Sequence, residues 1–185
     1  MKWMIASDIH GSAWYCRKML EAFDREGAGK LVLLGDILYH GPRNSLPRDY
    51  DPKEVIPMLN ERKEYLLCVR GNCDTEVDQM VLEFPILADY AVFYHEGRLF
   101  YATHGHQYSP DSPPPLSPGD VLLNGHTHIP AWEETKNGFL YLNPGSVSLP
   151  KGESAHTYLI MEGNWVALKE LDGRKIWSHS LNHTH

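Results

Sequence analysis

The segment "KLVLLGD", residues 30–36, is a short uninterrupted apolar run that ends in glycine and aspartate, a pattern typical of a buried β-strand. Toward the N-terminus, residues 12–27 carry apolar side chains at helical spacing, and "KWMIAS" (2–7) is another predicted buried strand. Toward the C-terminus, residues 52–63 form a second predicted helix and "EYLLCVRGN" (64–72) a third strand. This alternation of strands and helices is typical of a parallel sheet with crossover helices.

Past residue 85 the pattern changes to shorter apolar segments joined by turns such as Glu96-Gly97 and Gly163-Asn164, which favours an antiparallel region. The predicted strands are "ILADYAVFYHEG", "RLFYATHG", "DVLLNG", "FLYLN", "AHTYLIMEG" and "WVALKEL". Residues 108–120, "YSPDSPPPLSPGD", contain five prolines and are expected to form a stiff surface loop. The predicted fold class is α/β (α+β), with two mixed β-sheets packed face to face and helices on the outside.

Length and composition indicate an ordinary globular chain. We expect the 185 residues (1–185) to form a single domain, with 42% apolar and 22% charged residues. The net charge of −7 argues against non-specific binding to nucleic acid or to an anionic membrane, because both require a basic surface. Three cysteines without C-x-x-C spacing favour a reducing compartment. With neither a signal peptide nor a membrane span expected, we predict a cytoplasmic protein.

Polar side chains follow five of the predicted strands. Ligands bind outside the carboxyl ends of strands in α/β sheets, because loops from several elements converge there. Any one of these residues alone could be a helix cap, a turn residue or a surface residue, but together they predict one polar cluster. They are Asp8 and His10, Asp36, Asn72 and Asp74, His104 and His106, and His126 and His128.

The composition of this cluster favours a site for two metal ions. Imidazole and carboxylate ligands suit Mn²⁺, Zn²⁺, Fe or Ni²⁺, and the lack of clustered thiolates argues against a structural zinc site. Two ions about 3.5–4 Å apart need a bridging carboxylate, which an aspartate at a strand end can supply. His126 and His128 are two residues apart, so in an extended segment both side chains would point the same way, one toward each ion.

The motifs "DIH", "GD", "GNCD", "HGH" and "GHTH" occur in this order between Asp8 and His128. In this the chain resembles the calcineurin-like metallophosphoesterases, and "GDILYHGPRN", "GNCD" and "NPGSVSLPKG" resemble the YfcE-type phosphodiesterase branch of that family. The resemblance implies a four-layer αββα sandwich and a centre with two divalent metal ions, often Mn²⁺.

The resemblance also implies a role for each position. The first metal ion would be held by Asp8, His10 and His128, the second by Asn72, His104 and His126, with Asp36 bridging both. His106 would lie near substrate or a ligand, and Asp74 would orient a histidine through its second ring nitrogen. The candidate catalytic residues are therefore Asp36, Asn72, Cys73, Asp74 and His106.

The predicted activity is hydrolysis of a small phosphodiester. Two divalent ions bring +4 and Asp8 with Asp36 return −2, which leaves about +2 to attract a phosphate. In this hypothesis a hydroxide bridging the ions attacks phosphorus in line. Arg43 and His40 in "HGPRN" are candidate substrate-binding residues, or else residues of a solvated loop. "NPGSVS" (143–148) either shapes the floor of the pocket or is simply a turn.

Cys73 departs from the pattern of many relatives, which carry a histidine there to protonate the leaving group. Cys73 is either a small apolar filler or a sign that general acid catalysis is lost, which would favour stabilised leaving groups. Two alternatives to a phosphodiesterase stay open. One is a phosphomonoesterase, and the other is a scaffold for a protein partner, like the retromer subunit of the same family with its incomplete metal site.

Several aromatic and histidine residues near the C-terminus remain outside this scheme. Tyr158, Trp165 and Trp177 belong either to a homo-oligomer interface or to the core of the second sheet. Three histidines beyond the last apolar strand are expected to be exposed and unrelated to the site; they are His179, His183 and His185.

Overall fold

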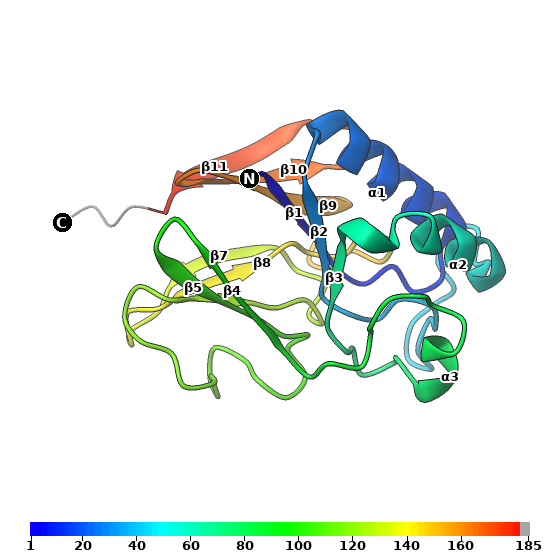
Figure 1. Cartoon of the computed structure of the whole chain (residues 1–185), viewed down its shortest axis with the longest axis horizontal. Helices are drawn as coiled ribbons and strands as arrows, with labels where there is room; N and C mark the ends of the chain where they lie inside the picture. The colour runs from blue at the N-terminus through cyan, green and yellow to red at the C-terminus, as the bar shows by residue number, and fades with distance from the viewer. Residues whose placement is uncertain (182–185) are drawn as a thin grey trace.

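The computed structural model describes residues 1–181, so His183 and His185 lie outside the described residues. The first of its two sheets has six strands in the order β11-β10-β9-β1-β2-β3 (Figure 1). β1, β2 and β3 pair in parallel, and β9 pairs antiparallel with β1. The strands are β1 (Trp3–Ala6), β2 (Lys30–Leu33), β3 (Leu66–Cys68), β9 (Thr157–Glu162), β10 (Trp165–Glu170) and β11 (Lys175–Ser180).

Helices connect the parallel strands, as predicted. α1 (Ala13–Glu26) begins where the Ser12 hydroxyl accepts a hydrogen bond from the Tyr15 N–H, and it ends at Gly27, whose φ is 61°. α2 (Pro52–Asn60) is capped by Asp51 and is shorter than the predicted 52–63, because a 3₁₀ turn, Lys63–Tyr65, leads into β3. α3 (Glu76–Gln79) is a single turn. The predicted strand 64–72 is paired only at Leu66–Cys68, because the chain then turns into a loop.

The second sheet has five strands in the order β4-β5-β6-β8-β7. They are β4 (Ala91–His95), β5 (Arg98–Ala102), β6 (Val121–Leu123), β7 (Ala131–Glu134) and β8 (Leu140–Asn143). The expectation of an antiparallel region is wrong for half of this sheet, because β5, β6 and β8 pair in parallel. The proline-rich loop carries the chain back from the end of β5 to the start of β6, as a parallel connection requires.

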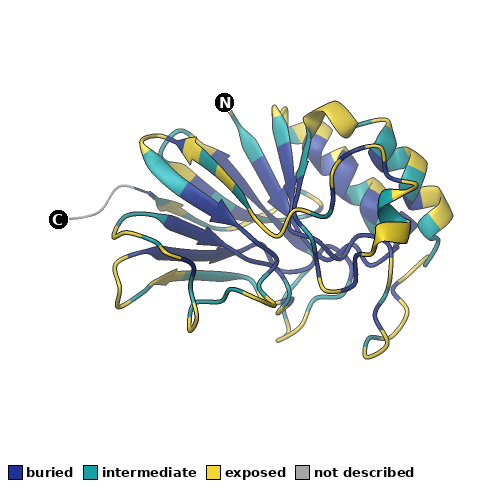
Figure 2. Cartoon of the chain, turned by 60° about the horizontal axis from the view of Figure 1, so that its bottom comes forward, coloured by how far each residue is buried: buried dark blue, intermediate teal, exposed yellow. Residues whose placement is uncertain are grey.

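One hydrophobic core lies between the two sheets and a second one lies beneath the helices. Successive residues of β1 point to opposite faces, so Met4 packs toward α1 while Ile5 packs toward the second sheet. Figure 2 shows the strand interiors as buried and the outer helix surfaces as exposed. Two mixed sheets packed face to face confirm the predicted fold class.

The outer layers differ in kind. α1 and α2 cover the first sheet, whereas between residue 80 and residue 181 the chain forms no helix (Figure 1). Tyr108 and Leu116 of the proline-rich loop pack instead on the outer face of the second sheet, against Tyr101 and Leu122. Prolines lack the N–H that a helix needs, so this stretch forms the outer layer as a loop.

The late aromatic residues belong to the first sheet and not to the second, because β9 to β11 extend that sheet. Tyr158 is fully buried under α1, Trp177 is partly buried between the sheets, and Trp165 is 58% exposed. His179 is exposed as expected, but it lies within β11, where its ring stacks on Trp132 at 4.5 Å. No helix among residues 1–181 is long and apolar enough to cross a membrane.

Candidate metal centre

The loops after β1, β2, β3, β5 and β6 meet at one edge of the two sheets, where hydrogen bonds join their backbones. The Asp8 N–H donates to the Gly35 carbonyl at 3.1 Å, which links the loops after β1 and β2. The Gly125 N–H donates to the His104 carbonyl at 2.8 Å, which links the loops after β5 and β6. The polar residues predicted from the strand ends are thereby brought to one place.

Asp8, His10 and His128 form one buried group of facing ligand atoms. Asp8 Oδ1 lies 3.5 Å from His10 Nε2 and 3.2 Å from His128 Nε2, and the two Nε2 atoms are 3.2 Å apart. All three side chains are buried, and Asp8 Oδ1 accepts no hydrogen bond. A buried carboxylate oxygen without a hydrogen-bond donor, facing two imidazole nitrogens, fits a divalent cation.

Asp36 connects this group to a second one. Its Oδ2 atom lies 3.6 Å from His10 Nε2 and 3.4 Å from His104 Nε2. His104 Nε2 is in turn 3.0 Å from Asn72 Oδ1 and 3.2 Å from His126 Nδ1. One carboxylate oxygen therefore faces both groups, as a bridging ligand must.

Hydrogen bonds to backbone carbonyls fix the orientation of three of these imidazoles. In each, Nδ1 lies within hydrogen-bond distance of a carbonyl oxygen, so Nδ1 carries a proton and Nε2 faces the cluster, where it can bind either a proton or a cation. The carbonyls are those of Tyr39 for His10 (2.8 Å), Leu34 for His104 (2.6 Å) and Leu149 for His128 (2.6 Å). His126 is turned the other way and presents Nδ1.

Five of the seven candidate ligands have left-handed backbone conformations, which non-glycine residues rarely adopt. Their φ angles are 60° for Asp8, 49° for His10, 55° for Asp36, 64° for His126 and 60° for His128. Such strain costs on the order of 1 kcal/mol or more per residue and is found at functional sites. The prediction of an extended 126–128 segment was wrong, although the two histidines do reach different groups.

Glycines beside the ligands allow the loops to approach closely. A Cβ atom at Gly71 would lie 2.2 Å from Asp36 Oδ1, and one at Gly125 would lie 1.9 Å from Ser7 Oγ. Both distances are far below van der Waals contact, so a side chain at either position would displace a ligand loop.

The charges of the cluster shift the pKa values of its members. Burial, the largest single effect, lowers the pKa of His104, but the carboxylates of Asp36 and Asp8 outweigh it and raise that pKa to about 9. Burial likewise raises the pKa of Asp8, yet the nearby His10 and His128 hold it well below its usual range. The carboxylates therefore favour positive charge in this space, supplied by protons when no cation is bound.

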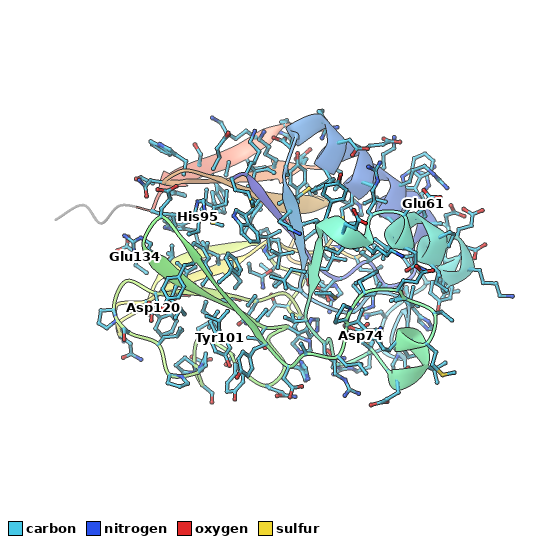
Figure 3. The ribbon with its side chains drawn as sticks, viewed as in Figure 1. Glu61, Asp74, His95, Tyr101, Asp120 and Glu134 are labelled. Atoms are coloured by element: carbon cyan, nitrogen blue, oxygen red, sulfur yellow. The ribbon has the colours of Figure 1, made fainter. Side chains whose placement is uncertain are left out.

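Asp74 supports the cluster in a different way from the one predicted. Its carboxylate accepts hydrogen bonds from the backbone N–H groups of Asp36 (2.9 Å), Ile37 (2.9 Å) and Gly71 (2.7 Å), and from no histidine. Burial raises the pKa of Asp74, and these donors oppose that shift. Asp74, labelled in Figure 3 beyond the end of β3, thus fixes the turn that presents Asp36.

A pocket of about 460 Å³ opens over the cluster. It is lined by Asp36, Asn72, Cys73, His126 and His128, by residues 41–44 with the candidate Arg43, and by two residues that the sequence did not single out, Thr127 and Lys151. His40 does not line this pocket, because its ring packs edge-on against Tyr39 and Tyr50. His106 is exposed and lies beside the second group, with its ring centre 5.4 Å from that of His104 and 6.2 Å from that of His126.

The "NPGSVS" segment holds the ligand loops from behind. The Ser146 and Ser148 hydroxyls donate to the Asp8 carbonyl at 2.9 and 3.0 Å, and the Asn143 side chain donates to the Gly125 carbonyl at 2.8 Å. This turn therefore supports two ligand loops, a role that its sequence alone did not distinguish from that of an ordinary turn.

Known proteins share both the sequence and the fold. The family model of the calcineurin-like phosphoesterase superfamily domain matches residues 1–164. The chain is 45% identical to phosphodiesterase YfcE of Escherichia coli strain K12 over 176 residues, or 95% of each protein. The solved structure of YfcE, described as a phosphoesterase from E. coli, matches with a TM-score of 0.94 at 44% identity and covers 98% of this chain and 100% of that one.

More distant structures share the architecture. An archaeal phosphodiesterase matches with a TM-score of 0.61 at 25% identity, covering 88% of this chain and 93% of its own. Vacuolar protein sorting 29 from Cryptosporidium parvum matches with a TM-score of 0.58 at 20% identity over 97% of each chain, which shows a common fold alone. The family model and the identity to YfcE together show that this chain is a phosphoric ester hydrolase of the calcineurin-like phosphoesterase superfamily.

Proposed function

We propose that this protein is a phosphodiesterase that acts with two divalent metal ions, with Mn²⁺ as the leading candidate and Zn²⁺, Fe or Ni²⁺ as alternatives. The observation that carries the proposal is the position of Asp36 Oδ2, within 3.6 Å of His10 Nε2 and 3.4 Å of His104 Nε2. The relative named phosphodiesterase YfcE, 45% identical over nearly the whole chain, supports the choice of a diester.

In this proposal Asp8, His10 and His128 hold one ion, and Asn72, His104 and His126 hold the other, with Asp36 between them. When bound, the ions would supply Lewis-acid activation of water and of the phosphoryl oxygens. The chain's own contribution is rigidity: the Nδ1 contacts with carbonyls and the hydrogen bonds to Asp74 hold the ligand atoms in place before substrate arrives.

In this proposal Cys73 does not act as an effective general acid that protonates the leaving group. Burial, with Asp36 and Asp74 nearby, raises the pKa of the Cys73 thiol to about 12, so the thiol holds its proton at neutral pH. An acid of this strength gives little help to a poor leaving group. A diester with a stabilised leaving group therefore suits the site better than an alkyl monoester.

In addition to the proposed metal ions, the Arg43 side chain provides a positive charge for binding the substrate. Its guanidinium group belongs to the 41–44 loop, which lines the pocket together with Asp36 and Cys73. A guanidinium fork matches two non-bridging phosphate oxygens, so we assign Arg43 to substrate binding. The structure gives no similar placement for His40.

The first experiment compares hydrolysis of bis(p-nitrophenyl) phosphate and p-nitrophenyl phosphate by metal-stripped protein before and after addition of Mn²⁺. We expect turnover only with Mn²⁺ and a higher kcat/KM for the diester. Mn²⁺-dependent turnover that prefers the monoester would replace the proposal by a phosphomonoesterase. Two bound ions per chain without any turnover would favour a scaffold for a protein partner instead.

A further inference from the structure

We propose that Lys151 determines specificity by binding a second anionic group of the substrate, beyond the phosphodiester that is cleaved. This inference rests on the proposed function, because it assigns the substrate class of the same pocket. Lys151 lines that pocket together with Asp36, Asn72 and His128.

The backbone of Lys151 is tied to a candidate metal ligand. The Lys151 N–H donates to the His128 carbonyl at 3.1 Å, and the carbonyl two residues earlier, at Leu149, lies 2.6 Å from His128 Nδ1. The segment that carries the lysine thus holds both the backbone and the imidazole of His128. The lysine stem begins at a fixed point beside the proposed centre.

The turn that follows fixes this point further. The Lys151 carbonyl accepts hydrogen bonds from the Ser154 N–H at 3.2 Å and the Ser154 hydroxyl at 2.6 Å. Gly152 has a φ of 63°, and a Cβ atom at this position would lie 3.6 Å from the Ile129 side chain. Backbone donors and acceptors on both sides of Lys151 are therefore satisfied, and the freedom that remains belongs to its side chain.

The ammonium group is available for a ligand. Within residues 1–181, Lys151 Nζ makes no hydrogen bond and no ion pair, although the chain has a net charge of −7. Some lysines do pair with glutamates, such as Lys18 with Glu21 at 2.8 Å and Lys169 with Glu26 at 2.7 Å, and others do not, so Lys151 is distinguished by its place at the pocket. An exposed but unpaired cation at a pocket of a negatively charged protein is suited to an anionic ligand.

The other groups of the pocket indicate which class of anionic ligand Lys151 would bind. The proposed metal ions and the Arg43 guanidinium already provide for the phosphate that is cleaved. Lys151 adds a flexible point charge that reaches the pocket from a different loop. A pocket of about 460 Å³ is of the size that accommodates a whole small-molecule ligand, so both halves of a diester fit. The favoured class is thus a phosphodiester with a further phosphate or carboxylate.

Two esters that differ by one remote charge test this inference. The p-nitrophenyl ester of thymidine 5′-phosphate and its 3′-phosphorylated form share the cleaved bond and the leaving group. At constant ionic strength, we expect wild type with Mn²⁺ to show the higher kcat/KM for the 3′-phosphorylated ester. Lys151→Ala should reduce the ratio of the two kcat/KM values about three- to tenfold, mainly through KM, because a remote contact contributes uniform binding.

Two further variants control the test. Lys151→Arg, which keeps the charge, should retain most of the preference. Lys136→Ala removes an exposed lysine from the turn between β7 and β8, which does not line the pocket, and should leave the ratio unchanged. An equal ratio in wild type and Lys151→Ala would overturn the inference, as would a wild type with no preference between the esters.

A binding measurement separates this inference from the proposed function. If wild type with Mn²⁺ hydrolyses bis(p-nitrophenyl) phosphate but neither thymidine ester, the proposed function stands; if it hydrolyses none of the three, the proposed function fails. In both cases calorimetry decides the role of Lys151. The inference then requires thymidine 3′,5′-bisphosphate to bind the Mn²⁺-loaded wild type more tightly than thymidine 5′-phosphate does. The ratio of the two Kd values must fall at least threefold in Lys151→Ala. The same ratio in both proteins would refute the role of Lys151.

Discussion

Asp36 is the residue through which the two groups of candidate ligands meet, since its Oδ2 atom faces both His10 and His104. Its Oδ1 atom accepts a hydrogen bond from the Cys73 N–H at 2.8 Å, so the carboxylate is held in one orientation. We expect Asp36→Ala to bind fewer than two ions per chain and to retain less than a tenth of wild-type diesterase activity. Metal content by mass spectrometry and turnover of bis(p-nitrophenyl) phosphate measure both effects.

The control for this substitution is Asp111→Ala, which removes an exposed carboxylate from the proline-rich loop. This variant should keep both its metal content and its turnover. Activity of Asp36→Ala above about a tenth of wild type would contradict the bridging role.

Cys73 allows a gain of activity to be tested. Its side chain lies at the pocket, close to Gly41, and its thiol pKa of about 12 makes it a poor acid. Cys73→His places an imidazole with an ordinary pKa near 6.5 at this position. General acid catalysis is typically worth about 10²–10⁴-fold and matters most for poor leaving groups, so turnover of an alkyl monoester such as glycerol phosphate should rise at least tenfold relative to that of p-nitrophenyl phosphate. Cys73→Ser, which supplies no acid, serves as control, and a ratio that does not change in Cys73→His would count against a missing acid.

At the scale of residues, the sequence predicted which side chains come together in the candidate metal centre but not their backbone conformations or hydrogen-bond partners. Aspartates and histidines after apolar strands identified the cluster because the carboxyl ends of parallel strands share an edge. The left-handed conformations of His126 and His128 were not visible, since spacing along a sequence does not specify φ. Lys151 was missed because only the fold brings it to His128, and Asp74 was misassigned because its partners are backbone groups.

At the scale of elements, local signals succeeded and pairing partners were harder to infer. Ser12 and Gly27 mark both ends of α1 because capping depends on neighbouring residues. The parallel pairing of β5, β6 and β8 escaped prediction because alternation of side chains is the same in parallel and antiparallel strands. The proline-rich layer over the second sheet was predicted as a surface loop, but its sequence does not specify that Tyr108 and Leu116 pack on the outer face of that sheet.

Glu26 ties the end of α1 to the first sheet and gives a prediction about stability. Its carboxylate accepts hydrogen bonds from Lys169 Nζ at 2.7 Å and from the Tyr158 hydroxyl at 2.8 Å, with only 9% of the side chain exposed. Glu26→Gln removes the charge and keeps the shape. We expect the variant to lose about 1–3 kcal/mol of unfolding free energy at pH 7, measured by urea denaturation.

The pH dependence of that loss follows from the direction of the pKa shift. Burial raises the pKa of Glu26, but Lys169 and Tyr158 outweigh it, so the folded pKa lies below the ordinary value of 4.5. The stabilisation is therefore fully present above pH 4.5 and disappears as the pH falls through the lower folded value. Glu21→Gln changes an exposed residue of the same helix and should lose little unfolding free energy at pH 7 or at pH 3. A Glu26→Gln deficit that is the same at pH 7 and at pH 3 would contradict an ionic origin.

On the scale of the whole molecule, the candidate centre lies at the seam between the two sheets. Asp8, Asp36 and Asn72 follow strands of the first sheet, whereas His104 and His128 follow strands of the second. Ions bound there would join the sheets at the edge where their strained ligand loops meet. Metal binding and global stability are therefore expected to be coupled, because the unfolded chain does not hold these ligands together.

This coupling predicts a thermal shift with a defined pH dependence. At a free Mn²⁺ concentration of 100 times Kd, binding to the folded state alone adds about 2.7 kcal/mol to the free energy of unfolding, and each kcal/mol raises Tm by about 2–4 °C for a chain of this size.

Without metal, the carboxylates raise the pKa of His104 to about 9, so Mn²⁺ must displace a proton there. The shift in Tm at a fixed Mn²⁺ concentration should consequently be larger at pH 8 than at pH 6, with wild type compared with Asp36→Ala by differential scanning fluorimetry. In Asp36→Ala the shift should be small at both pH values. A wild-type shift that is equal at pH 6 and pH 8 would mean that protons and Mn²⁺ do not compete for these ligands.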